Sequence, residues 1–192
     1  GWAAGQSQPQ RSATVFAAAI GIGLAGFLTG YLWDVAQVRG WRRAARLLPL
    51  GSLACAAAST ALLAAHPWRI EVPAAIRWAC AVAAALFLVV FLYSVFVEVP
   101  LRARGAASDR RLVRSGTYAL CRHPGALWFA PGFVSLGFAL GSAALLVASP
   151  LWVLAELLWV WLEDRYILVR LFPEYREYQK ETPFLVPSRK SI

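Results

Sequence analysis

The chain has 192 residues, of which 59% are hydrophobic and 15% are charged, so it is too apolar and too poor in charge for an ordinary soluble domain. Its 19 Lys and Arg residues, against 10 Asp and Glu residues, stand in short loops between apolar runs. That grouping is typical of membrane topology and argues against a groove for nucleic acid. Three scattered cysteines predict neither a disulfide framework nor a metal site. We therefore expect an integral membrane protein with no metal and no nucleic-acid partner.

Apolar runs of sufficient length predict about five transmembrane helices. The first, over 12–33, carries Gly21, Gly23, Gly26 and Gly30, a spacing that permits close approach between helices. Its length and the lack of a small-residue cleavage site favour a membrane helix over a signal peptide. The second and third runs, at 47–65 and 73–97, are separated by a short polar turn and are expected to form a helical hairpin. A charged connector follows at 98–123.

The stretch over 124–162 has Glu156 as its one ionisable side chain and is too long for a single helix across a hydrocarbon core of roughly 30 Å. The Ser149-Pro150 step predicts a break, giving helices over 124–148 and 150–171. A break at Gly141-Ser142 is the alternative, and it would move Glu156 relative to the membrane midplane. The expected fold class is all-α: one membrane helical bundle over 1–192 with a helical C-terminal segment at 163–187.

Positive charge alternates along the chain. The Lys and Arg residues number one before the first helix, four in the first loop, about two in the second, six in the third, none in the fourth and six after the last helix. By the positive-inside tendency, the connector at 98–123 and the C-terminal tail lie in the cytoplasm. We therefore expect an integral protein of a plasma or bacterial inner membrane, with both unusual polar segments on its cytoplasmic face.

The segment at 112–124 reads LVRSGTYALCRHP and runs directly into an apolar helix. Pro124 predicts the first turn of that helix, preceded by Arg122 and His123. The free N–H groups of a helix N-terminus suit a carboxylate or another anionic group of a ligand. The alternative interpretation is an interfacial arginine beside a His-Pro helix cap.

The fifth helix carries polar and aromatic side chains at spacings of three and four residues, which places them on one face. These residues are Trp152, Glu156, Trp159, Glu163, Tyr166 and Arg170. Glu163 stands where the apolar run ends, so it is expected to accept hydrogen bonds from a ligand ammonium. Glu156 lies about 10 Å deeper by helical rise. It is either a functional carboxylate in a cavity or a protonated acid bonded to a neighbouring helix.

The segment LVRSGTYALCRHP, the ED pair at 163–164, EYREY and TPFLVP together resemble the isoprenylcysteine carboxyl methyltransferase family, which is broadly related to the phospholipid methyltransferases. The resemblance covers Leu112 to about Pro187, while the first three helices match in hydropathy alone. It implies a membrane methyltransferase that binds S-adenosylmethionine (S-adenosyl-L-methionine) at the cytoplasmic end of the bundle. It also implies a lipophilic acceptor that enters from the lipid bilayer.

Carried over by position, the resemblance implies three groups of cofactor-binding residues. The adenosyl side takes Arg110, Arg111, Leu112 and Val113, with Tyr118 close by. The methionine side takes Arg122, His123, Pro124, Gly125 and Ala126. The third group is Glu163, which would hold the amino group, together with Tyr175 of the Tyr-x-x-Tyr motif.

Two departures from the family leave the acceptor open. Ala126 stands where a tyrosine is common, and Trp159 replaces an arginine that contacts the acceptor in the eukaryotic enzymes. A carboxylate acceptor would then need Arg165 or Arg170 as its cation, beside Glu156 as the third expected catalytic residue.

O-methylation of a carboxylate on an isoprenoid-like thioether is the nearest analogy, and N-methylation of a lipid amine or S-methylation of a thiol are alternatives. Trp152 and Trp159 beside Glu156 favour an amine or a thiol. Two further hypotheses are not enzymatic: a small transporter with Glu156 as its cation site, or a structural subunit built on the Gly-rich first helix.

Overall fold

The computed structural model describes residues 7–99 and 111–188, and this part of the chain is almost wholly helical. An isolated antiparallel bridge joins Arg69 and Ser142. Two of the helical segments, η2 and η3, are π-helical turns that directly continue the helices before them. In chain order the segments are α1 (Gln8–Arg39), α2 (Arg42–Ala65), α3 (Ala74–Leu92), η2 (Tyr93–Glu98), α5 (Thr117–Leu120), α6 (Pro124–Leu140), α7 (Ala143–Leu162), η3 (Glu163–Ile167), α8 (Leu168–Leu171) and α9 (Tyr175–Glu181).

Four of these helical stretches are long and apolar enough to cross a membrane: α1, α2, α3 with η2, and α7 continued through η3 and α8. The fifth apolar helix, α6, has 17 residues. It is therefore about 25 Å long, somewhat less than the hydrocarbon core of a bilayer. Large apolar side chains of α2 and α3 are exposed, as expected where helices face lipid. The predicted all-α membrane bundle is confirmed.

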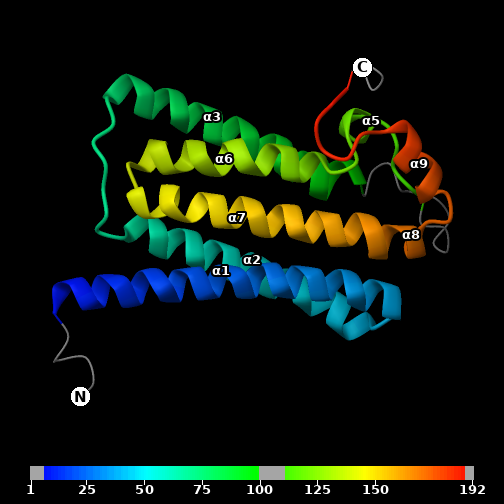
Figure 1. Ribbon diagram of the computed structural model, residues 1–192, viewed down its shortest axis with the longest axis horizontal. Coiled ribbons are helices and arrows are strands. Elements are labelled where there is room, and N and C mark those ends of the chain that lie inside the picture. Colours follow the sequence, from blue (N-terminus) through cyan, green and yellow to red (C-terminus); the bar gives the residue numbers. More distant parts are fainter. Residues whose placement is uncertain (1–6, 100–110, 189–192) are drawn as a thin grey trace.

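The helices form two pairs joined by a central helix (Figure 1). α1 packs along α2, α3 packs along α6, and α7 lies between the pairs, in contact with α6, α1 and α2. The predicted hairpin of the second and third helices is wrong, because α2 and α3 belong to different pairs. The segment that joins them runs past the turn between α6 and α7. There Ile70 N–H donates to the Gly141 carbonyl at 3.0 Å, and Ala143 N–H donates to the Trp68 carbonyl at 3.1 Å.

The break between the fourth and fifth helices lies at Gly141-Ser142, so the predicted break at Pro150 is wrong. Gly141 has φ 60° and ψ 33°, a left-handed conformation that glycine adopts without a steric penalty and that ends α6. The Ser142 hydroxyl accepts a hydrogen bond from Leu145 N–H and so caps α7. Pro150 lies inside α7. The C-cap at Gly141 and the N-cap at Ser142, eight residues before the Ser149-Pro150 step, therefore set the boundary between the two helices.

Glycines of α1 allow α2 and α7 to approach it closely, as the spacing predicted. A Cβ atom at Gly23 would lie 2.2 Å from the Trp152 ring, and one at Gly30 would lie 2.4 Å from the Trp159 ring. A Cβ atom at Gly26 would lie 3.1 Å from the Cβ of Cys55 on α2. The two tryptophans of α7 thus occupy space that only glycine leaves on α1.

Candidate functional site

Asp164 is the centre of a hydrogen-bond network at one end of the bundle. Its buried carboxylate accepts from Arg122 Nε at 2.8 Å and Nη2 at 3.2 Å, and from Tyr175 Oη at 2.6 Å. Gln179 Nε2 donates to the same carboxylate at 2.9 Å, and His123 Nε2 lies 3.2 Å from it. These donors come from the segment before α6 and from α9. One carboxylate therefore joins the two sequence segments that carry the motifs.

Arg122 uses most of its donors inside the protein. Its Nη1 donates to the carbonyls of Thr182 at 2.6 Å and Gln179 at 3.1 Å, and its backbone N–H donates to the Pro183 carbonyl at 2.9 Å. The guanidinium also lies over the Phe184 ring, 5.6 Å from its centroid. Arg122 thus holds the segment after α9 against the start of α6, so the structure gives it a positioning role. Its predicted contact with a cofactor stays a prediction.

His123 lies between the two acidic side chains. Its Nε2 faces Asp164, and its Nδ1 is 3.6 Å from Glu163 Oε2. Burial lowers the pKa of His123, the hydrogen bond to Asp164 opposes that effect, and the positive charge of Arg122 adds to it. The imidazole is therefore expected to be neutral near pH 7, donating from Nε2 to Asp164.

Two consecutive carboxylates of the π-helical turn η3 face His123. Glu163 Oε2 lies 3.6 Å from Nδ1, and Asp164 Oδ1 lies 3.2 Å from Nε2. π-Helical turns are frequent at functional sites. The Glu163 side chain keeps 26% of its surface exposed, whereas that of Asp164 keeps 12%. Glu163 is therefore the carboxylate that a ligand can reach.

Further hydrogen bonds fix the segment before α6. The Tyr178 hydroxyl donates to the Tyr118 carbonyl, and the Tyr118 hydroxyl donates to the Ser94 carbonyl at 3.4 Å. Glu98, at the end of η2, accepts from the N–H of Thr117 at 3.1 Å and from its hydroxyl. Segment 112–124 is thus bound to η2 on one side and to α9 on the other.

Tyr175 is a hydrogen-bond donor held in its protonated form. Burial and the hydrogen bond to Asp164 raise the pKa of Tyr175, so the hydroxyl keeps its proton at neutral pH. Its ring packs against Tyr178 with centroids 5.7 Å apart. Both rings are buried, so the Tyr-x-x-Tyr motif anchors α9, and any contact of Tyr175 with a cofactor stays a prediction.

The first turn of α6 offers backbone donors beside this network. Pro124 is the first helical residue, and His123 provides no side-chain cap. The N–H groups of Gly125 and Ala126 therefore have no acceptor within the helix. Both residues are buried, and Gly125 packs closely against Val95 of η2.

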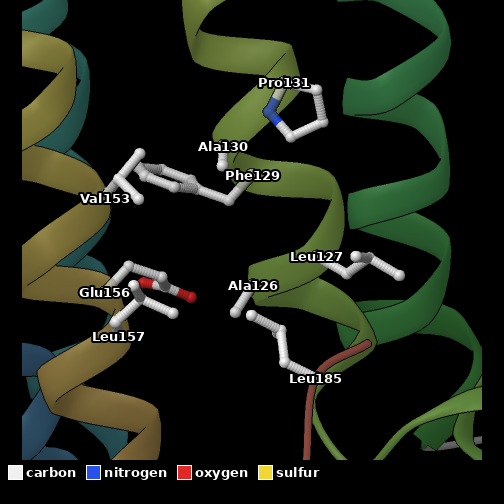
Figure 2. Close-up of a pocket in the computed structure, with 9 residues that line it drawn as sticks. All are labelled: Ala126, Leu127, Phe129, Ala130, Pro131, Val153, Glu156, Leu157 and Leu185. Atoms are coloured by element: carbon white, nitrogen blue, oxygen red, sulfur yellow. The ribbon is translucent and has the colours of Figure 1, made fainter. Parts of the chain in front are cut away.

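A cavity of about 310 Å³ opens between α6 and α7, next to Ala126 (Figure 2). Its lining residues are Ala126, Leu127, Phe129, Ala130, Pro131, Val153, Glu156, Leu157 and Leu185. Glu156 is the one ionisable side chain among them, and its carboxylate points across the cavity toward Ala126. Leu185 belongs to the segment that Arg122 holds in place, so the Asp164 network also shapes one wall of the cavity.

The two arginines expected to bind the acceptor lie elsewhere. Arg165 and Arg170 are exposed and do not line the cavity, and the Arg165 guanidinium lies 6.0 Å from the centroid of the Tyr166 ring. They lie on the exposed side of this helical stretch, whereas Glu163 and Asp164 face His123. The structure therefore does not bring these arginines together with Glu156.

The adenosyl group of predicted residues is only partly covered by the structure. Arg110 lies outside the described residues. Arg111 is exposed, Leu112 is half-buried and Val113 is buried. Tyr118 is half-buried, and its carbonyl accepts from the Tyr178 hydroxyl of α9.

Two acidic side chains have roles that the sequence does not predict. Asp164 belongs to the acidic pair at 163–164, for which the sequence predicts a role of Glu163 alone. The other is Asp34 of α1, whose Oδ2 accepts from Trp159 Nε1 at 2.7 Å. An acid directly after the apolar run over 12–33 is the available indication for Asp34. For Asp164 the sequence contains no indication, because its role depends on donors from Arg122 and from α9 that come together only in the tertiary structure.

Comparisons of the chain with protein-family models, with curated proteins and with solved structures found no match.

Proposed function

We propose that this protein is a membrane methyltransferase that transfers a methyl group from S-adenosylmethionine to a lipophilic acceptor. The observation that carries the proposal is the meeting of segment 112–124 with Glu163, Asp164 and Tyr175 beside an apolar cavity. The resemblance implies that these two segments share one cofactor site. Their direct contact through Asp164 is what such a site requires.

The residues at this end of the bundle suit a ligand with an ammonium, a carboxylate and a sulfonium. Glu163 is partly exposed and can pair with the ammonium. The free N–H groups of Gly125 and Ala126 can bind the carboxylate. Asp164 adds a second carboxylate at this end of the bundle, because both acidic side chains face His123.

S-adenosylmethionine would supply an electrophilic methyl group, so the protein needs little acid-base chemistry at the donor. The protein's task is to align the donor and the acceptor and to exclude water. The apolar side chains of Phe129, Val153 and Leu157 favour the exclusion of water from this cavity, and Leu185 lines it from the C-terminal segment.

We further propose that the site faces the cytoplasm. The turn between α1 and α2 lies at the same end of the bundle as α8 and α9 (Figure 1). The helix ends on either side of this turn carry Arg39, Arg42 and Arg43. α8 and α9 add Arg170, Arg176 and Lys180. Clusters of basic residues at one end favour the cytoplasmic side.

Equilibrium binding of S-adenosylmethionine to the purified protein tests the proposal. Calorimetry in detergent is expected to show binding to the wild type that weakens by about 30-fold or more in Glu163→Ala. Loss of one partner of a desolvated charge pair costs about 2 kcal/mol or more. Glu71→Gln changes an exposed acid at the opposite end and should bind as the wild type does.

The two possible failures have different meanings. Absence of binding at high micromolar cofactor, with the fold shown intact by its thermal transition, would refute the methyltransferase proposal. Binding that is unchanged in Glu163→Ala would refute the assigned role of Glu163 and leave the methyltransferase proposal standing.

A further inference from the structure

The cavity between α6 and α7 combines an apolar wall with one carboxylate. Eight of its nine lining residues are apolar, and the ninth is Glu156. At about 310 Å³ it lies at the lower end of the range for ligand pockets, roughly 300–1,000 Å³. An apolar pocket with a single polar group selects a ligand that has a hydrocarbon part and one complementary polar group.

Glu156 has no hydrogen bond and no ion pair with any residue in the described parts of the chain, 7–99 and 111–188. It lies in the middle of α7, within a stretch long and apolar enough to cross a membrane. A carboxylate in such surroundings is costly unless a partner compensates it. The alternative of an acid bonded to a neighbouring helix is therefore not what the structure contains, and the carboxylate is open to a ligand in the cavity.

The charges around the cavity decide whether the polar group of that ligand is a cation or an anion. Glu163 lies two turns further along the same helical stretch, about 10 Å by helical rise, and adds a second acidic side chain on the same face. Arg122, the cation of the Asp164 network, is already paired with Asp164. Arg165 and Arg170 are exposed and line no part of the cavity. A ligand carboxylate would therefore place a second negative charge beside Glu156, and none of the described residues that line the cavity is a cation that could compensate it.

We infer that the cavity receives the acceptor and that this acceptor is a lipophilic amine, with its ammonium paired to Glu156 and its hydrocarbon chain against the apolar wall. Phe129 contributes an aromatic ring to the same wall, which further favours a cation. The assignment of an acceptor rests on the proposed methyl transfer, whereas the binding of a lipophilic amine rests on the cavity alone.

In the inferred methyl transfer, Glu156 acts as the base. The ammonium of the acceptor gives one proton to the Glu156 carboxylate and becomes a neutral amine. The amine nitrogen lone pair then forms a bond to the methyl carbon as the sulfur–carbon bond breaks and its electron pair stays on sulfur. The products are a methylated ammonium and a neutral thioether, and the proton leaves Glu156 to solvent in each cycle.

Binding of chain-length-matched probes tests the inference without requiring turnover. The probes are radiolabelled dodecylamine, dodecanoic acid, dodecanol and dodecanethiol, each measured on protein in nanodiscs of zwitterionic lipid with empty nanodiscs subtracted. The wild type is expected to bind dodecylamine saturably and about tenfold or more tightly than the other three probes. Glu156→Gln should lose that preference, Glu156→Asp should keep most of it, and Glu71→Gln should behave as the wild type.

Two outcomes would overturn the inference. One is a wild type that binds the acid, the alcohol or the thiol as tightly as the amine. The other is a preference for the amine that survives in Glu156→Gln. Thermal unfolding of each variant shows whether it is folded. If Glu156→Gln does not fold, weak binding of the amine to Glu156→Asp relative to the wild type would overturn the inference, and a retained amine preference would support it.

Transfer of labelled methyl groups then separates the two proposals. A base-stable labelled product from dodecylamine is expected, whereas a base-labile methyl ester from dodecanoic acid would overturn the amine assignment and leave methyl transfer standing. If the protein binds dodecylamine through Glu156 but does not bind S-adenosylmethionine, the methyltransferase proposal fails and the amine-binding cavity stands.

Discussion

Replacement of Asp164 with asparagine is expected to release the C-terminal segment from the membrane helices. The Asp164 carboxylate accepts from Arg122, His123, Tyr175 and Gln179, and the Arg122 and Asp164 side chains are only 11% and 12% exposed. Asparagine has the same shape but removes the charge and turns an N–H2 group toward these donors. Breaking a buried ion pair by removing one partner costs about 3–5 kcal/mol.

Hydrogen exchange measures this release at two amides. Arg122 N–H donates to the Pro183 carbonyl across the two segments, so it is protected only while the segment is docked. Thr182 N–H donates to the Tyr178 carbonyl and closes the last turn of α9, a helix of 7 residues that is too short to persist once it is released. A cost of about 3–5 kcal/mol corresponds to exchange that is roughly a hundred-fold to several-thousand-fold faster. Amides in the middle of α1 and α7 should exchange at unchanged rates, because their hydrogen bonds lie within the helices.

The matched control is Glu177→Gln, which changes an exposed acid on α9. It should alter exchange at these amides by a few-fold at most, since exposed charges contribute about 0–1 kcal/mol. Equal protection of Thr182 and Arg122 in Asp164→Asn and in the wild type would show that another contact holds the segment. The argument that Asp164 joins the two motif segments would then be refuted.

Two further predictions concern packing and pH. Gly30→Ala is expected to lower the thermal midpoint in detergent by several degrees, because its Cβ would lie 2.4 Å from the Trp159 ring and overpacking costs about 1–3 kcal/mol. Gly21→Ala, which meets nothing within 4 Å, is the control, and equal midpoints for the two variants would contradict the packing account. The stability of the wild type should fall as pH falls below about 6.5, because burial lowers the pKa of His123 and the unfolded chain then binds the proton more tightly than the folded one. The contribution of neutral His123 to the free energy of unfolding is fully present above about pH 6.5. Between pH 7.5 and pH 5, the thermal midpoint of His123→Gln should therefore depend less on pH than that of the wild type. An equal pH dependence in the two proteins would mean that another group is responsible.

The sequence predicted the helices well because helix formation and membrane insertion depend on local composition. Runs of about 20 apolar residues identified the membrane-crossing segments, and the glycines of α1 correctly indicated close packing. The helix ends were less accurate. α1 extends from Gln8 to Arg39, beyond the predicted 12–33, because polar residues continue a helix past the apolar run.

The partners of each helix were not predictable from the sequence. The hairpin expected for the second and third helices assumed that neighbours in the chain pack together. The structure instead places α3 on α6, because the extended segment between α2 and α3 pairs with the turn at Gly141. Such contacts join residues distant in sequence, and hydropathy contains no information about them.

The candidate site divides in the same way. The sequence alone determined a membrane bundle with a polar segment ending at His123 and an acidic pair at the end of the last long helix, since residue type and spacing express these features directly. The tertiary structure decided that Asp164 rather than Glu163 joins the two segments and that Glu156 opens into a cavity of α6 and α7. It also decided that Arg165 and Arg170 point away. Each of these depends on the surfaces against which α7 and η3 pack, and the directions of side chains around a helix acquire a meaning only when the opposing surface is in place.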